Sequence, residues 1–512
     1  MSFIRINALQ IGDEDWSKSR ELPYYVTWTY ISDVDADILE NMLGGIVDPY
    51  DVVFIDKKIE DARSISIIEK LIKPHTLFIT ETLRSCELID TMATRKKAKY
   101  MSINGLAYVL DNELEFFYSS SHGEKHTLNS VALTHGFKGS VRWNAGCNVE
   151  IDADYGEEYR QVVFWRRNIP VYENQTIDLW LEYIKDDSVD IELHLDLIVS
   201  GTLDTIYKSY VYTEEDMQNI VTIKNDRKNV NVFISLFARG KGKLKIVALH
   251  NRYSRGFHGY FIPGGQRIVT KNREEIFYYY CPGDMKPPLN VYFTRNRKLE
   301  GFEGTRMMNK LGSPYLLISD VRLEGGAFYL GSEEYETRIA DIIRKHMYEL
   351  GFTGDQVILS GISMGAFAAM YYACDIRPHA VIAGKPILNV GSMAAAETID
   401  RPGGFPTSLD ILSFFEESDE GAVDRMNDRF WHKFDGVRWD DTSFIIMHMY
   451  EDDYDNQAYS GLLSHIDSDR ACVYGIGLHG RHNDNTNGIV RWFKRQYADI
   501  LERDFDRSIA DD

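Results

Sequence analysis

Cysteine is scarce in this sequence, and long apolar runs are missing from it. Only 5 of the 512 residues are cysteine, they lie far apart, and none forms a C-x-x-C pair. This pattern excludes a disulfide scaffold and the usual zinc motifs, and it favours a reducing compartment. No uninterrupted apolar stretch reaches ~18 residues, and the N-terminus lacks an apolar core behind a basic flank. We therefore expect a cytoplasmic protein with no signal peptide and no membrane span.

Positive charge is also under-represented. The chain carries 57 Lys and Arg against 78 Asp and Glu, which gives a formal net charge of −21. Such an acidic chain is repelled by polyanions, so nucleic acid and anionic membrane surfaces are excluded as main partners. Hydrophobic residues make up 44% and aromatic residues 12%, which indicates folded, globular units. A chain of this length exceeds a single core, and we expect two to four units.

The first unit, residues 1–125, mixes strand and helix signals. Two short apolar runs, 51–56 and 76–80, predict buried strands, and apolar residues at helical spacing over 65–72 predict a helix between them. This alternation is typical of a small α/β domain. The unit contains no G-x-G-x-x-G and no P-loop, so the sequence offers no support for nucleotide binding.

The second unit, residues 126–255, changes to a period of two. Apolar and polar residues alternate over 191–199 and in several similar segments, which predicts a β-sandwich resembling a carbohydrate-binding module. Trp143, Trp165 and Trp180 are candidates for stacking on sugar rings. Packing of these tryptophans in the core is the favoured interpretation, because aromatic side chains bury large areas.

The third unit, residues 256–512, is predicted to be an α/β-hydrolase domain. Glycine and proline concentrate over 252–288, which we interpret as the connector into this unit. Helix-period segments such as 339–350, which Gly351 closes as a C-cap, alternate with short buried strands, so we expect a parallel sheet with crossover helices. The predicted strands are 290–294, 315–319, 357–359, 380–383, 444–447 and 471–474.

A G-x-S-x-G pentapeptide, residues 361–365, joins an apolar run to an alanine-rich, helix-forming run. In α/β hydrolases this motif forms the nucleophile elbow, where the chain reverses sharply between strand and helix and holds the serine hydroxyl above the helix N-terminus. The motif alone is common by chance, and the alternative is a glycine-rich turn in a βαβ unit. The strand and helix signals on either side favour the elbow, with Ser363 as nucleophile.

The acid of a catalytic triad is expected after a later strand, because α/β hydrolases supply serine, acid and histidine in that order. The segment 448–455 follows the predicted strand that ends at Met447 and is rich in carboxylates. Spacing from the strand favours Asp452, and Glu451 and Asp453 are alternates.

The base is expected after the next strand, which ends near Tyr474. The loop 477–484 contains two histidines. His482 is preferred because it lies on the polar run that leads into the last helix, and His479 is the alternate. A serine becomes nucleophilic when an imidazole takes its proton, and a carboxylate holds that imidazole in the required tautomer.

Two backbone N–H groups are expected to stabilise the oxyanion. One belongs to Met364, directly after the nucleophile, and the other to the loop that follows the strand 290–294, centred on Arg295. The glycine-rich loop 324–331 is a further candidate for lining the site. We expect no metal and no resident cofactor.

The three-part order and the segments GISMGAF, MHMYEDDYD and GLHGRHND resemble the second accessory secretory protein of the accessory Sec system in Gram-positive bacteria. The resemblance spans essentially the whole chain. It implies a cytoplasmic protein that works with other accessory secretory proteins and an accessory SecA-type motor to export a serine-rich-repeat glycoprotein adhesin. It also implies O-acetylation of N-acetylglucosamine on that adhesin, with a triad of Ser363, an acid within 451–453, and His482.

Two other functions are compatible with the same residues. One is a carbohydrate or carboxyl esterase with the same triad, in which water replaces the sugar hydroxyl as acceptor. The other is a non-enzymatic export factor whose triad is vestigial. For the transferase, an acyl donor such as acetyl-CoA is required, and the sequence does not identify it.

Overall fold

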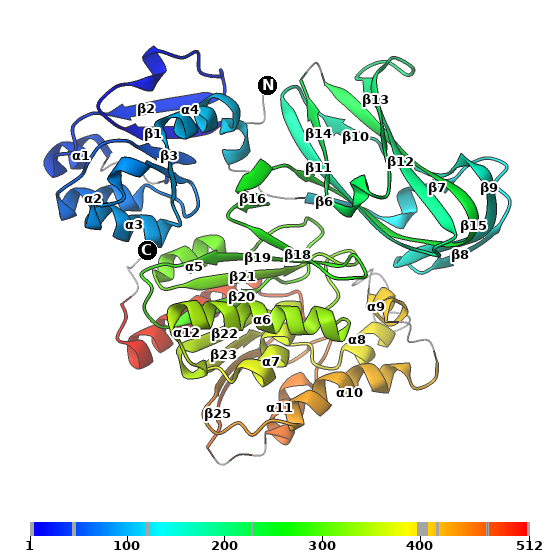
Figure 1. Cartoon of the computed structure of the whole chain (residues 1–512). Coiled ribbons are helices and arrows are strands. Elements are labelled where there is room, and N and C mark those ends of the chain that lie inside the picture. Colours follow the sequence, from blue (N-terminus) through cyan, green and yellow to red (C-terminus); the bar gives the residue numbers. More distant parts are fainter. Residues whose placement is uncertain are drawn as a thin grey trace.

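In the residues that the structure describes, three large sheets and a short two-stranded pair make up the framework (Figure 1). In the part of the chain that the structure describes, no helix is both long enough and apolar enough to cross a membrane. The computed structural model describes residues 5–43, 48–118, 123–226, 229–396, 408–415, 419–466, 468 and 470–508.

The N-terminal sheet is entirely parallel, in the order β2-β1-β3-β4-β5. Helices α1, α2 and α3 contribute to the apolar core on one face, and α4 to the core on the other. The predicted strands and the helix between them are confirmed as β3, β4 and α2. The elements are β1 (Ile6–Ile11), β2 (Val26–Ile31), α1 (Ala36–Leu43), β3 (Val52–Ile55), α2 (Ala62–Lys70), β4 (Leu77–Thr80), α3 (Glu87–Lys96), β5 (Lys99–Met101) and α4 (Ile103–Asn112).

The middle sheet is antiparallel and is organised around two long strands, β9 and β15. Register shifts between them mark bulges, which bend a sheet, and the connected strands enclose one apolar core. The period of two is confirmed in β12, whose side chains alternate between buried and partly exposed. The strands are β6 (Gly123–His126), β7 (Val131–Leu133), β8 (Ser140–Asn144), β9 (Asn148–Trp165), β10 (Ile169–Val171), β11 (Gln175–Lys185), β12 (Val189–Val199), β13 (Ile206–Tyr212), β14 (Val221–Asn225) and β15 (Val230–Tyr253).

The tryptophans proposed for sugar stacking divide into two groups. Trp165 and Trp180 are only 1% and 3% exposed, so they fill the interior and cannot stack on a sugar. Trp143 is 46% exposed and is the one of the three that a ligand can reach. The favoured interpretation, packing in the core, is therefore confirmed for Trp165 and Trp180 and is wrong for Trp143.

The C-terminal sheet has the order β18-β19-β21-β20-β22-β23-β24-β25. All six predicted strands are present as β20 to β25, but the prediction that each is buried is wrong for β25, which lies at the edge of the sheet and is largely exposed. The strands are β18 (Gln266–Val269), β19 (Glu275–Cys281), β20 (Leu289–Phe293), β21 (Tyr315–Asp320), β22 (Val357–Ile362), β23 (Ala380–Gly384), β24 (Ser443–Met449) and β25 (Cys472–Leu478), and the small pair is β16 (Gly259–Tyr260) with β17 (Ile262–Pro263).

Two predictions about this region are wrong. Residues 252–288 are not a connector, because β15 continues to Tyr253 and the segment then supplies the first two strands, β18 and β19. The sheet is not purely parallel either, because β19 runs antiparallel to both of its neighbours. The glycines and prolines that suggested a connector lie mainly in turns, whereas the buried run 275–281 forms β19.

Helices cover both faces of the C-terminal sheet (Figure 1). The predicted helix over 339–350 is confirmed within α6, and Gly351 closes it with φ 70°. Helices α6, α7 and α10 pack on one face, and α5 and α12 pack on the other. The helices are α5 (Thr305–Leu311), α6 (Glu333–Leu350), α7 (Met364–Ile376), α8 (Val390–Ala396), α9 (Ser408–Phe414), α10 (Ala422–Asp435), α11 (Ala458–His465) and α12 (Thr486–Phe505).

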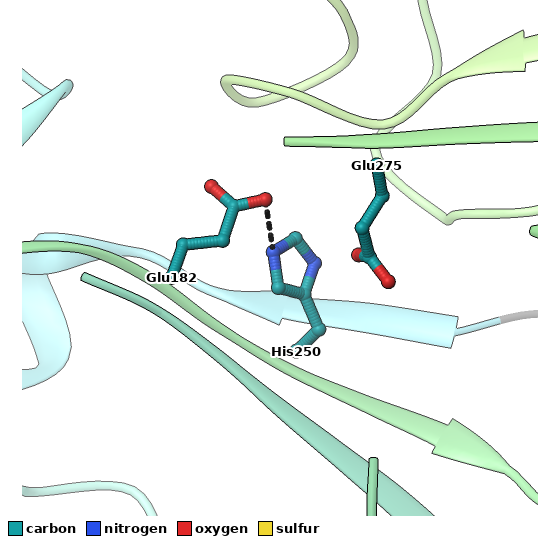
Figure 2. Close-up of side chains that lie close together, drawn as sticks. All are labelled: Glu182, His250 and Glu275. Atoms are coloured by element: carbon teal, nitrogen blue, oxygen red, sulfur yellow. Dashed lines mark ion pairs between the residues drawn. The ribbon is translucent and has the colours of Figure 1, made fainter. Parts of the chain in front are cut away.

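The middle and C-terminal sheets meet on a cluster of buried charges. Arg252 on β15 donates to Glu275 on β19 at 2.7 Å and to Glu300 at 2.7 Å. His250 lies 2.5 Å from Glu300 and 3.2 Å from Glu182. Figure 2 shows Glu182 and Glu275 on opposite sides of the His250 ring. Each buried charge has a partner of opposite sign, which is the condition for keeping charges inside a protein.

Candidate active site

The predicted elbow is a strained turn between β22 and α7. Ser363 occupies this turn with φ 57° and ψ −120°, a conformation that non-glycine residues rarely adopt. A side chain at Gly361 would place its Cβ 2.2 Å from the backbone of Gly365. A side chain at Gly365 would place its Cβ 2.2 Å from the carbonyl oxygen of Phe293 on the neighbouring strand β20. Both glycines are therefore required by the close approach of backbone, as the motif predicts.

The structure brings Ser363, His482 and Asp452 together. Ser363 Oγ lies 2.8 Å from His482 Nε2. On the other side of the ring, His482 Nδ1 lies 2.9 Å from Asp452 Oδ2. An ionised carboxylate only accepts hydrogen bonds, so Nδ1 carries the proton and Nε2 is free to accept the serine proton. The three residues follow β22, β24 and β25, so the parallel strands deliver all three side chains to one edge of the sheet.

Burial and hydrogen bonding shift the pKa values of His482 and Asp452. Burial lowers the pKa of the His482 imidazole below its ordinary value, although the neighbouring Asp452 acts in the opposite direction. Burial alone would raise the pKa of the Asp452 carboxyl, but hydrogen bonds from His482, Tyr454 N–H and Asp455 N–H bring it below its ordinary value. At neutral pH the imidazole is therefore uncharged and the carboxylate ionised, as a base and its orienting acid require.

The alternate acids, Glu451 and Asp453, and the alternate base, His479, lie outside the hydrogen-bonded series from Ser363 to Asp452. His479 Nδ1 lies 2.9 Å from Glu451 in a pair at the surface, and the side chain of His479 is 85% exposed. Asp453 accepts a hydrogen bond of 3.0 Å from the backbone N–H of His482. Neither His479 nor Glu451 is hydrogen-bonded to Ser363 or His482 among the described contacts. Both residues instead connect the two loops that carry the acid and the base.

The two predicted oxyanion donors differ in the structure. The Met364 N–H is the first of α7, so it has no acceptor within the helix. The Arg295 N–H donates at 3.3 Å to Glu303. Beside it, the side-chain Nδ2 of Asn296 is buried and has no hydrogen-bond partner. Met364 thus offers a free donor next to Ser363, whereas the Arg295 N–H is engaged in this structure.

A cavity of about 200 Å³ opens at Ser363. Phe328 lines it, so the glycine-rich loop 324–331 contributes a wall of the site as expected. A side chain at Gly326 in this loop would place its Cβ 2.5 Å from the Met364 side chain, which shows how closely the loop packs on the elbow. The lining residues are Arg295, Asn296, Arg297, Phe328, Ile362, Ser363, Met364, Lys385, Ile387, Tyr454, His482 and Asn483.

Sequence reasoning missed two residues that contact His482. Tyr454 stacks on the imidazole with ring centroids 4.2 Å apart. Lys385 donates its ammonium at 2.5 Å to the carbonyl oxygen of His482 and is itself buried. Tyr454 lies within the carboxylate-rich segment, and Lys385 follows β23 directly. Position after a strand was the available signal for Lys385, but no motif distinguishes it.

One group of side chains in the described part of the chain has the spacing of metal ligands, and it lies away from Ser363. It consists of Glu182, His250 and Glu275 (Figure 2). Glu275 accepts from Arg252 through both of its oxygens and also from Arg267. Two guanidinium groups beside the carboxylate disfavour a divalent cation, so this group does not fit a metal centre.

Comparison with known proteins identifies relatives over nearly the whole chain. A family model described as "Accessory Sec system GspB-transporter" matches residues 6–507. The second accessory secretory protein of Streptococcus gordonii is 35% identical over 507 residues, which is 98% of this chain and 99% of that protein. Its counterpart from Staphylococcus aureus is 32% identical over 517 residues and 98% of each chain. A chain of the Glycosylation Associate Protein (Gap123) complex from Streptococcus agalactiae superposes with a TM-score of 0.89 at 31% identity, covering 99% of this chain and all of that one.

Proposed function

Because the chain belongs to the accessory Sec system GspB-transporter family, we propose that it is a serine-dependent O-acetyltransferase of that system. Its acceptor is N-acetylglucosamine on a serine-rich-repeat glycoprotein adhesin, whose export it also supports. The observation that carries the proposal is the hydrogen-bonded chain from Ser363 through His482 to Asp452. That arrangement has the geometry of an activated serine nucleophile.

The reaction proceeds in two halves. In the first, His482 Nε2 takes the proton of Ser363 Oγ, the oxygen attacks the acyl carbonyl, and the leaving group departs with the proton that His482 held. In the second, a sugar hydroxyl gives its proton to His482 and attacks the acyl-enzyme, which releases the acetylated sugar and returns the proton to Ser363. The Met364 N–H stabilises the oxyanion that forms in each half.

The acyl donor is proposed to be a thioester such as acetyl-CoA. Arg295 and Arg297 line the Ser363 cavity in a chain whose formal net charge is −21. Arg295 is ion-paired with Glu303 at 2.8 Å, so the cation of Arg297 is the one of the two that favours a donor carrying phosphate groups. The thiolate of such a donor leaves readily and accepts the proton from His482.

Water competes with the sugar for the acyl-enzyme, so the same triad also supports an esterase. The walls of the cavity bear on this choice, because Phe328, Ile387 and the ring of Tyr454 face the site together with the polar groups. Apolar walls limit the amount of water near the acyl group. A bound sugar whose hydroxyl is held next to the acyl carbon then reacts faster than water. We therefore place transfer ahead of hydrolysis.

The proposed setting is a cytoplasmic complex. The similarity to a chain of the Gap123 complex supports assembly with other accessory secretory proteins. Membership of the family further supports work with an accessory SecA-type motor and the glycosylated adhesin. These partners fit a chain in which about half of the residues lie outside the unit that carries the triad.

Mass spectrometry of the adhesin's glycans tests the proposal. The adhesin is co-expressed with the wild-type chain, with Ser363→Ala or with His482→Ala, each at matched protein level. We expect acetylated N-acetylglucosamine with the wild type and none with either variant. His479→Ala serves as the matched control and should leave acetylation in place. Unchanged acetylation in the Ser363→Ala strain would remove the serine from the mechanism.

A further inference from the structure

We propose that a second cavity, between the middle and C-terminal sheets, is a saccharide-binding subsite that holds the acceptor glycan beside the Ser363 site. The identity of this ligand as acceptor rests on the proposed function. The cavity measures about 290 Å³ and is lined by residues of β6, β11 and β15 on one side and of the loop 324–331 and α9 on the other. Its size suits one small polar ligand.

The charges around this cavity favour a neutral ligand. Lys125 contributes a cation, but its ammonium already donates at 2.5 Å to the carbonyl oxygens of Val321 and Leu323. Glu182, Glu324 and Asp410 contribute carboxylates. An anion would meet these carboxylates, and a divalent cation would meet the lysine. A polyhydroxyl compound, which both donates and accepts hydrogen bonds, matches such a mixed lining.

His126 forms part of the wall of this cavity. Its side chain is only 4% exposed, and its Nε2 lies 2.6 Å from the Oδ1 of Asn251. Because that oxygen accepts, Nε2 carries the proton and Nδ1 is an acceptor, and Nδ1 has no hydrogen-bond partner in the structure. Burial also lowers the pKa of His126, which keeps the ring neutral and Nδ1 unprotonated. Nδ1 is enclosed by protein atoms, so a neutral imidazole forms part of the cavity wall, and the exposed side chain of Asn129 is the group that a sugar hydroxyl reaches.

The remaining walls are held in place without a ligand. The Gly146 N–H donates at 2.9 Å to Asp410, and Cys147 Sγ donates to the carbonyl oxygen of the same residue. These bonds fix α9, with Phe414, over the cavity. On the opposite side, Glu182 is oriented by its ion pair with His250 (Figure 2). Because these side chains are already ordered, less conformational entropy is lost when a ligand binds.

The position of the cavity connects it to the chemistry. Glu324, at one end of the loop 324–331, lines this cavity, whereas Phe328 of the same loop lines the Ser363 cavity. A small cavity of about 10 Å³ shares Lys125 with this cavity and Arg295 with the Ser363 cavity, and it is too small to hold a sugar. An acceptor that carries several sugars therefore binds one of them here and presents another at Ser363 across the loop. Such two-point binding raises the local concentration of acceptor at the acyl-enzyme.

Hydrogen–deuterium exchange of the full chain, with and without free N-acetylglucosamine, tests the subsite. Sugar bound there slows exchange in the segments 123–129 and 144–148, and sugar at the triad is read separately in 479–485. Asn129→Ala should raise the sugar concentration needed for half-maximal protection by about two- to tenfold, the effect of one lost hydrogen bond. His126→Ala removes part of the cavity wall and should also raise that concentration. His135→Ala, an exposed histidine of the same unit outside the cavity, should behave like the wild type.

The outcomes are distinct. Absence of protection over 123–129 and 144–148, or equal half-maximal concentrations in all proteins, overturns the subsite. Protection of these segments by an unglycosylated serine-rich peptide but not by the sugar also overturns it. Asn129 is exposed, so its variant decides the matter if His126→Ala does not fold. Hydrolysis of a small aryl acetate reports on the triad alone, so loss of that activity with intact protection counts against the proposed function and not against sugar binding.

Discussion

At the scale of single residues, the protonation state of His482 controls the proposed reaction. The imidazole must be neutral to accept the serine proton, and burial lowers its pKa below the ordinary value of 6.5. A base with a lowered pKa stays active at neutral pH and loses activity only when the pH falls through that lower value.

This gives a prediction for the pH profile. The kcat/KM for a small aryl acetate should fall on the acid side with a midpoint below 6.5, because protonation of free His482 removes the base. The profile is measured on the wild-type chain, with His479→Ala as a control for the exposed histidine. A midpoint above 6.5 would contradict the environment described for His482.

The choice of Asp452 as acid gives a second prediction. Asp452→Asn preserves shape but cannot hold the proton on His482 Nδ1, so kcat should drop by roughly 10³- to 10⁴-fold, as in related triads. Glu451→Gln alters the surface pair with His479 and should change kcat by only a few-fold. Kinetics of both variants on the same substrate, with thermal unfolding to confirm folding, make the comparison. Equal losses in the two would reopen the assignment of the acid.

The residues of the candidate site illustrate what could be read from the sequence. Ser363, Asp452 and His482 were each placed by local pattern, because a glycine-flanked serine and polar loops after buried strands have recognisable spacing. Lys385 and the state of the Arg295 N–H could not be predicted, since both depend on contacts with distant segments: one with the carbonyl oxygen of His482, the other with Glu303. Local spacing contains no information on such pairings.

At the scale of elements, the elbow depends on backbone packing. Replacing Gly361 with alanine introduces a Cβ 2.2 Å from the Gly365 backbone, and neither backbone segment can move away without disturbing β22 or α7. We expect Gly361→Ala to lower the free energy of unfolding by about 2–4 kcal/mol and to abolish aryl acetate turnover.

Gly436→Ala is the matched control for this prediction. Gly436 has φ −68°, and its Cβ would meet the nearest atom at an ordinary 3.4 Å. The substitution should leave activity unchanged and stability the same or slightly raised. Urea unfolding of both variants supplies the measurement, and similar stabilities would show that the close approach at the elbow is tolerated.

The first two strands of the C-terminal sheet show where pattern reading fails at this scale. The glycines and prolines between 256 and 288 are real turn signals, but the turns flank β18 and β19 rather than form one connector. The antiparallel direction of β19 is also outside the reach of local pattern, because strand direction is set by which neighbours pair. Most of the later strands were predicted correctly because they are buried parallel strands with continuous apolar runs, whereas β25, at the edge of the sheet, is largely exposed.

At the scale of the whole molecule, the buried charges hold the middle and C-terminal sheets together and make stability depend on pH. Burial alone would raise the pKa of the Glu275 carboxyl, but Arg252 and Arg267 lower it from 4.5 to about 2. A carboxylate with a lowered pKa stabilises the folded protein above its unfolded value of 4.5, and this stabilisation is lost as the pH falls toward 2.

The wild-type chain should therefore lose stability steeply between pH 4.5 and about 2. Glu275→Gln should be less stable at neutral pH, because it leaves buried arginine charge without its partner, and should lose less on acidification. Urea unfolding of both proteins across this range measures the difference. Parallel curves would indicate that Glu275 does not contribute to the acid dependence.

The acyl-enzyme is the direct test of the central claim. The purified chain is incubated with acetyl-CoA without acceptor, and intact and peptide mass spectrometry locate any acetyl group. The account predicts one acetyl group on the peptide that contains Ser363, its loss on addition of N-acetylglucosamine with formation of acetylated sugar, and no adduct in Ser363→Ala. An adduct that persists in Ser363→Ala, or acetylated sugar formed by that variant at the wild-type rate, would contradict it.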